Sequence, residues 1–191
     1  MKRRMPELAL HFAVPFALTA PVLGLRKATV VSFLALIPDL DVFFHVHRSP
    51  SHSVILLLVV SLAAVGLVSR LKPKFLGLAL AGSLALLSHP LMDVFSTYTP
   101  ILYPLMLTSV YVDFEGRLLI GGSATPSSSA QVNTTPTVFE SFQRLDAPIF
   151  TSEGFIVSLL LVAIPLIVVF LIRVQTGSKP LSWRGIRRSS G

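Results

Sequence analysis

The residues of this chain that can do chemistry are concentrated in two short stretches. Residues 38–53 form an Asp- and His-rich stretch between two apolar segments. Further along, His89 and Asp93 have the i, i+4 spacing that places both side chains on one face of a helix. The chain has no cysteine, so a metal site must be built from imidazole and carboxylate groups. The pattern predicts a divalent metal site with the ligands His11, Asp39, His52, His89 and Asp93. Zinc suits these donors best, with manganese or iron as alternatives.

Three further residues of the first stretch are predicted to take part in catalysis. Asp41 and His47 would orient the ligands or act as a general base. Arg48 either pairs with Asp39 or Asp41, or binds a phosphate or carboxylate of a substrate through its planar guanidinium. Nothing resembling a nucleophile elbow surrounds the neighbouring serines, which are therefore interpreted as loop or capping residues.

The composition predicts that these residues are carried by membrane segments. The chain of 191 residues is 52% hydrophobic and 13% charged, with a mean hydropathy of +0.75, whereas soluble domains are about 25% charged. We expect an all-α polytopic membrane protein with about five membrane segments. One of them, residues 28–37, is too short to span alone. It either continues through residues 40–44 or stops in the membrane as a broken or re-entrant helix.

Four regions are predicted along the chain. Residues 1–105 would form a membrane domain that holds the metal site, and residues 106–153 an extracytoplasmic insertion. Residues 154–174 would form a C-terminal transmembrane helix, followed by a basic cytoplasmic tail at 175–191. Within the insertion, residues 110–120 alternate as expected for a β-hairpin that turns at Glu115 and Gly116. Residues 121–135 are predicted to be a flexible loop, and residues 137–145 a short amphipathic helix with a capping box.

The net charge of +7 is explained by membrane topology rather than by nucleic-acid binding, because the basic residues flank apolar segments. Five crossings would put ten of the 16 basic residues, and none of the nine acidic ones, on one side. These ten are Arg26, Lys27, Arg70, Lys72, Lys74, Arg173, Lys179, Arg184, Arg187 and Arg188. The positive-inside rule then predicts a multi-pass cell-membrane protein with a cytoplasmic C-terminus and an extracytoplasmic metal site. The expected partners are the bilayer and a lipid; the oligomeric state stays open.

The motifs resemble those of a known family. Pro38-Asp39-Leu40-Asp41, His47-Arg48 followed by Ser51-His52-Ser53, and Ser88-His89 followed by Asp93 resemble the YdjM-like family of predicted membrane-bound metal-dependent hydrolases. The N-terminal His11 fits as well, and the resemblance covers roughly residues 5–105. Ser49-Pro50 departs from the pattern, since such sequences often have a glycine after His-Arg.

A more distant resemblance is to zinc-dependent phospholipase C. It implies that Asp39, His52, His89 and Asp93 hold one zinc ion, with His11 near a second. The later ligands of those enzymes have no counterpart here, so a full three-metal site is not expected.

Together these patterns predict a membrane-embedded hydrolase that cleaves a phosphoester or related ester of a lipid or lipid-linked substrate, using water activated by the metal. Two alternatives remain open. One is a transporter of metal ions or protons, although the ligands gather on one side and not at the midplane. The other is a non-catalytic membrane protein with a structural metal.

Overall fold

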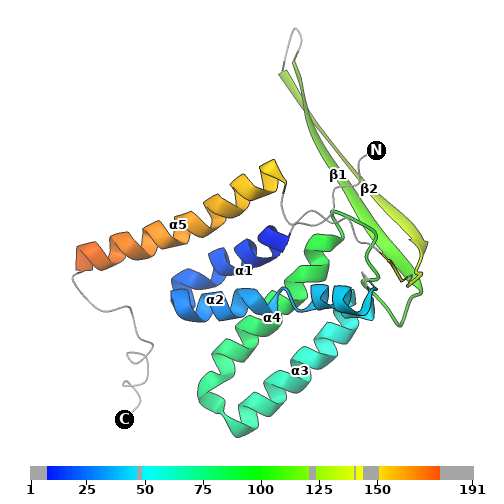
Figure 1. Cartoon of the computed structure of the whole chain (residues 1–191). Helices are drawn as coiled ribbons and strands as arrows, with labels where there is room; N and C mark the ends of the chain where they lie inside the picture. The colour runs from blue at the N-terminus through cyan, green and yellow to red at the C-terminus, as the bar shows by residue number, and fades with distance from the viewer. Residues whose placement is uncertain (1–7, 47–48, 121–123, 140, 144–150, 177–191) are drawn as a thin grey trace.

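The computed structural model describes residues 8–46, 49–120, 124–139, 141–143 and 151–176. The fold is a set of apolar helices from which one long β-hairpin projects (Figure 1). In chain order the helices are α1 (Leu8–Leu23), α2 (Leu25–Leu34), η1 (Pro38–Phe44), η2 (Pro50–His52), α3 (Val54–Leu71), η3 (Pro73–Phe75), α4 (Leu76–Asp93) and α5 (Ser152–Thr176). The strands β1 (Thr108–Ile120) and β2 (Ala124–Pro136) lie between α4 and α5 in sequence.

Within the described chain, three helical segments are long and apolar enough to cross a membrane. They are α3, the η3–α4 segment Pro73–Asp93, and the part Ser152–Ile172 of α5. The prediction of about five membrane segments is therefore wrong in number. The 16 residues of α1 make a helix of about 24 Å, shorter than the roughly 30 Å hydrocarbon core. The ten residues of α2 are shorter still.

These two short helices form an antiparallel pair. Gly24, which joins them, has φ 78, a left-handed conformation that glycine adopts without steric cost. The rings of Phe12 and Phe33 meet at 5.1 Å, so the start of α1 lies beside the end of α2. After Leu34 the backbone tightens to i→i−3 hydrogen bonds and continues into η1. The helix is therefore broken between Leu34 and Pro38, and whether this segment is re-entrant stays a prediction.

Small side chains allow the helices to pack closely. Phe16 and Ala20 of α1 are buried against Ala28 of α2, with Val162 of α5 packed on the same cluster. A second cluster joins α2 to α4. At this contact a Cβ on Gly82 would meet the side chain of Leu34 at 2.7 Å, so glycine permits the close approach. The α2–α4 contact fixes η1, which follows α2, relative to the end of α4.

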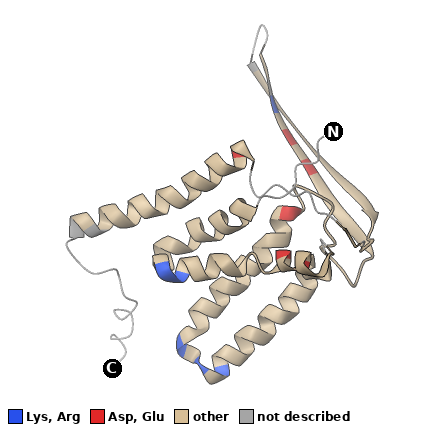
Figure 2. Cartoon of the chain, in the orientation of Figure 1, with Lys and Arg blue, Asp and Glu red and all other residues tan. Residues whose placement is uncertain are grey.

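Charges are separated along the helices (Figure 2). The turns between α1 and α2 and between α3 and α4 are basic, whereas the acidic residues of the described helices lie at the opposite ends. The basic residues in or next to these turns are Arg26, Lys27, Arg70, Lys72 and Lys74, and the acidic residues are Asp39, Asp41, Asp93 and Glu153. Such separation is typical of membrane helices whose two ends face different compartments.

The β-hairpin is present, but its turn was predicted at the wrong place. Glu115 and Gly116 lie in the middle of β1, where they pair with Ser129 and Ser128 of β2. The predicted flexible loop at 121–135 is likewise wrong, since most of it forms β2. Its Ser- and Thr-rich composition does not prevent pairing, because the backbone groups of β1 supply the hydrogen bonds. The connection at 121–123 lies outside the described residues.

The amphipathic helix predicted at 137–145 is not found in the described part of that stretch. Residues 137–139 are not helical, and Ser141 instead forms a β-bridge with Val46. The N–H of Phe142 also donates to the carbonyl of His45 at 2.9 Å. Pairing with the segment after η1 therefore uses the backbone groups that a helix would need. Glu140, on which the capping box depends, and Leu145 lie outside the described residues.

Candidate metal centre

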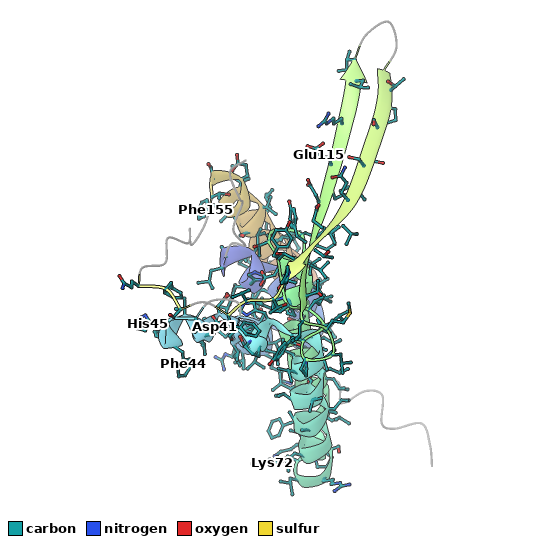
Figure 3. The ribbon with its side chains drawn as sticks, turned by 90° about the vertical axis from the view of Figure 1, so that its right-hand side faces the viewer. Asp41, Phe44, His45, Lys72, Glu115 and Phe155 are labelled. Carbon is teal, nitrogen blue, oxygen red and sulfur yellow. The ribbon has the colours of Figure 1, made fainter. Side chains whose placement is uncertain are left out.

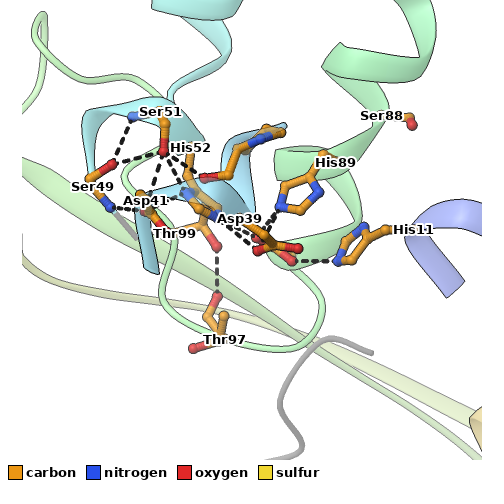
Figure 4. Close-up of polar contacts among 12 residues, drawn as sticks. His11, Asp39, Asp41, Ser49, Ser51, His52, Ser88, His89, Thr97 and Thr99 are labelled. Carbon is orange, nitrogen blue, oxygen red and sulfur yellow. Dashed lines mark hydrogen bonds and ion pairs between the residues drawn. The ribbon is translucent and has the colours of Figure 1, made fainter. Parts of the chain in front are cut away.

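The predicted ligands come from four elements whose ends meet at one place (Figure 4). His11 lies in the first turn of α1, Asp39 in η1 and His52 at the end of η2, while His89 and Asp93 occupy the last turns of α4. The three histidines and Asp93 are fully buried, whereas the Asp39 side chain keeps 20% of its surface exposed. Asp39 is therefore the member of this group that reaches the surface.

Four ligand atoms lie at nearly equal distances. Nε2 of His52 is 3.5 Å from Oδ1 of Asp39 and 3.5 Å from Oδ2 of Asp93. Nε2 of His89 is 3.4 Å from each of the same two oxygens. These separations exceed a normal N–H···O hydrogen bond of about 2.7–3.2 Å, yet the atoms point toward one another. Two nitrogens and two oxygens thus surround one common point.

Buried polar atoms need a partner. Nε2 of His89 and Oδ2 of Asp93 are buried and make no hydrogen bond within the described chain. A cation at the common point would satisfy both atoms at once. Asp39, His52 and His89 each offer one ligand atom within 4.8 Å of the others, as do His11, His89 and Asp93. The structure thus brings together a group of His and Asp side chains that can hold a metal ion.

The electrostatics of the centre favour a cation as well. Burial alone would raise the pKa of Asp39, but the imidazoles of His52 and His89 outweigh it and hold this pKa well below its usual range. For His52, burial alone would lower the pKa, but the carboxylates of Asp39 and Asp41 raise it above the usual value. The carboxylate of Asp39 is therefore ionised, and a metal ion would displace the imidazole proton that balances it.

Asp41 lies behind His52. Its Oδ2 accepts the backbone N–H of Ser49 at 2.9 Å and is 3.4 Å from Nδ1 of His52. The hydroxyl of Ser51 is 3.1 Å from the same nitrogen and 3.1 Å from the carbonyl of Pro38. A carboxylate can only accept, so Asp41 beside Nδ1 favours the tautomer of His52 that carries its proton on Nδ1. This tautomer turns the other nitrogen, Nε2, toward the common point.

Ser51 was interpreted from the sequence as a loop or capping residue. The structure gives it this additional contact with His52, for which the only sequence signal is that the two residues are adjacent. Ser53, by contrast, does cap α3 by accepting the N–H of Leu56. It also donates to the carbonyl of Tyr103, which ties the start of α3 to the loop after α4.

His11 contacts the centre from another side. Its Nε2 lies 3.0 Å from Oδ1 of Asp93, the carboxylate oxygen that does not face His52. Its ring also stacks on His89, with centroids 4.0 Å apart and planes at 25°. The described contacts of His11 thus hold two ligands in place, and a second ion between His11 and Asp93 is the alternative.

A His11→Gln variant separates these two roles. If His11 positions Asp93, the protein should still bind the same number of metal ions, with affinity lowered about 10–100-fold. Competition with a chromogenic chelator, together with metal analysis of the purified protein, measures both quantities. His45→Gln is the matched control, because His45 is exposed and points away from the centre. If His11→Gln loses one whole metal equivalent and His45→Gln does not, His11 is a direct ligand.

His47 and Arg48 lie outside the described residues, so their predicted roles stay predictions. All the other predicted site residues, His11, Asp39, Asp41, His52, His89 and Asp93, converge on the centre. Comparison with protein-family models, with curated proteins and with solved structures finds no match. The resemblance to the YdjM-like family therefore stays a prediction, and the function rests on the geometry of the centre.

Proposed function

We propose that this protein is a membrane-embedded zinc hydrolase that cleaves an ester, most simply a phosphoester, in a lipid or lipid-linked substrate. The observation that carries the proposal is the spacing of the four ligand atoms, 3.4–3.5 Å. Each of these nitrogen–oxygen separations is compatible with two ligands of one zinc ion whose bonds are about 2.0–2.2 Å long. Imidazole and carboxylate donors suit zinc best, with manganese or iron as alternatives.

The side chains around the centre have distinct tasks in this proposal. A zinc ion bound there would lower the pKa of a bound water molecule, so that hydroxide would be available to attack an ester at neutral pH. Asp41 and Ser51 fix the orientation of His52, and His11 fixes Asp93. Asp39, the partly exposed ligand, marks the side from which a substrate approaches in this proposal. His47 and Arg48 are proposed to assist proton transfer and anion binding, as the sequence predicts.

The location of the centre supports a lipid substrate. The ligands lie at the start of α1, before α3 and at the end of α4, so they are near one end of the candidate spanning helices. The basic turns lie at the other end. By the positive-inside rule, we propose that the centre faces the extracytoplasmic side and that the C-terminus is cytoplasmic.

Activity of the purified protein in detergent tests the proposal. We expect hydrolysis of a chromogenic phosphodiester or of a labelled phospholipid, loss of that activity with chelator, and recovery with zinc. His89→Ala should abolish it, because His89 provides one of the four ligand atoms. Asp113→Ala on the hairpin is a control outside the centre. If the zinc-loaded protein cleaves none of a broad panel of lipid esters, the hydrolase proposal is wrong.

A structural zinc site is the second candidate, because four protein ligands are typical of structural zinc sites. The hydrolase instead requires water as a further ligand of the zinc ion. X-ray absorption at the zinc edge distinguishes the two. A catalytic site should show an additional light-atom ligand that exchanges with added phosphate, whereas a structural site should show only the two imidazoles and two carboxylates.

A further inference from the structure

The short helix η1 carries exposed apolar side chains beside the centre. Phe43 and Phe44 are 76% and 80% exposed, and Leu40 is 50% exposed. Asp39, the partly exposed ligand, precedes Leu40 directly. Figure 3 shows η1 projecting from the α3–α4 pair, with Phe44 and His45 at its outer edge and Lys72 at the far end of α3. Large exposed apolar groups in such a cluster mark an interaction surface.

A second exposed apolar group belongs to the loop after α4, which the hydroxyl of Ser53 ties to the start of α3. Its members are Leu102, Leu105, Met106 and Leu107. This loop and η1 both adjoin the end of the α3–α4 pair. The apolar surface of that pair, which includes the exposed Val59, Val60 and Leu62, therefore continues toward both.

The depth of the centre can be read from helix length. From Leu76, which follows the basic turn, to His89 is about 20 Å along α4 at about 1.5 Å per residue. The hydrocarbon core of a bilayer is about 30 Å thick. With the basic turn at one boundary, the centre lies within the outer part of the hydrocarbon core, and tilt of α4 would place it deeper. Because η1 contributes Asp39 to the centre, it lies near the same depth.

We propose that Leu40, Phe43 and Phe44 insert among the acyl chains of the outer leaflet, and that the metal centre opens laterally to the bilayer beside Asp39. The occupant of this surface is a bilayer lipid, whose chains lie along η1 while its headgroup reaches Asp39. Insertion of η1 follows from exposure and depth, and its assignment to the outer leaflet rests on the proposed orientation. Lateral entry of a substrate also rests on the proposed hydrolase function.

Insertion is tested with one tryptophan. The only native tryptophan, Trp183, is first replaced by phenylalanine. Phe44→Trp is then made in this background and reconstituted into phosphatidylcholine vesicles with brominated chains. We expect strong quenching of its fluorescence. Phe114→Trp is the matched control, since Phe114 is 67% exposed but lies on the projecting hairpin, and it should be quenched weakly. Equal quenching at both positions would overturn the insertion.

Lateral entry is tested by comparing two substrates. Phe43→Ser/Phe44→Ser should lower the ratio of vesicle-lipid hydrolysis to short-chain phosphodiester hydrolysis about tenfold or more, because apolar contact with the acyl chains is lost. Phe114→Ser should leave this ratio unchanged. An unchanged ratio in the double variant would overturn lateral entry. If the zinc-loaded wild type cleaves neither substrate while Phe44→Trp is quenched, the hydrolase function and lateral entry of a substrate fail together, and the membrane contact of η1 stands.

Discussion

Replacement of Asp93 by alanine is expected to remove the bound divalent ion from the purified protein. Oδ2 of Asp93 lies 3.4 Å from Nε2 of His89 and 3.5 Å from Nε2 of His52, so it provides one of the four ligand atoms. The variant also loses one of the two negative charges that attract the ion. The metal content, measured by mass spectrometry, should fall from about one equivalent per protein to below about a tenth, as expected for loss of a direct ligand.

Asp113→Ala is the matched control, because it removes an aspartate from β1, outside the centre, and should keep the full equivalent. Asp93→Asn preserves the volume of the buried side chain and removes the charge, so it guards against misfolding of the alanine variant. Both variants should elute from a sizing column in detergent like the wild type. A full metal equivalent in Asp93→Asn and in Asp93→Ala would exclude Asp93 as a ligand.

Removal of the metal from the wild-type protein should lower its thermal stability substantially. The ion would link η1, the end of η2 and the end of α4, which supply Asp39, His52, His89 and Asp93. Binding to the folded state stabilises it by about 4 kcal/mol when the free metal is a thousandfold above Kd. For a chain of this size, that corresponds to a fall in Tm of about 10 °C. A thermal melt in detergent, with and without chelator, measures the effect.

The same melt on Asp93→Ala is the control, because a protein that binds no metal has nothing for the chelator to remove. Its Tm should be lower than that of the metal-loaded wild type and should not respond to chelator. An equal response in both proteins would mean that the chelator acts elsewhere, for example on detergent or on adventitious ions, and that the cluster does not bind the metal that stabilises the fold.

The sequence by itself determined the chemistry of the centre. The absence of cysteine restricts the ligands to imidazole and carboxylate. The i, i+4 spacing of His89 and Asp93 is a local property of any α-helix, and in α4 the two side chains do face one common point. Composition likewise predicted membrane helices, because an apolar helix of about 20 residues matches the thickness of the hydrocarbon core.

The number of crossings could not be read from the same signal. Hydropathy measures apolarity, and α1 is apolar enough; what it lacks is length, and α2 is shorter still and carries two basic residues. Their antiparallel pairing at Gly24 depends on contacts such as the one between Phe12 and Phe33. In the hairpin, β2 forms because β1 supplies hydrogen-bonding partners, which composition does not record.

Only the tertiary structure decided how the ligands are arranged. His11 and Asp93 lie in helices far apart in sequence, and nothing local specifies that they meet at 3.0 Å. The hydroxyl of Ser51 meets Nδ1 of His52, the carbonyl of Pro38 and the carboxylate of Asp41 only because η2 lies against η1. Side-chain type sets which groups can bind a metal, whereas distances near 3.4 Å arise from the packing of whole helices against one another.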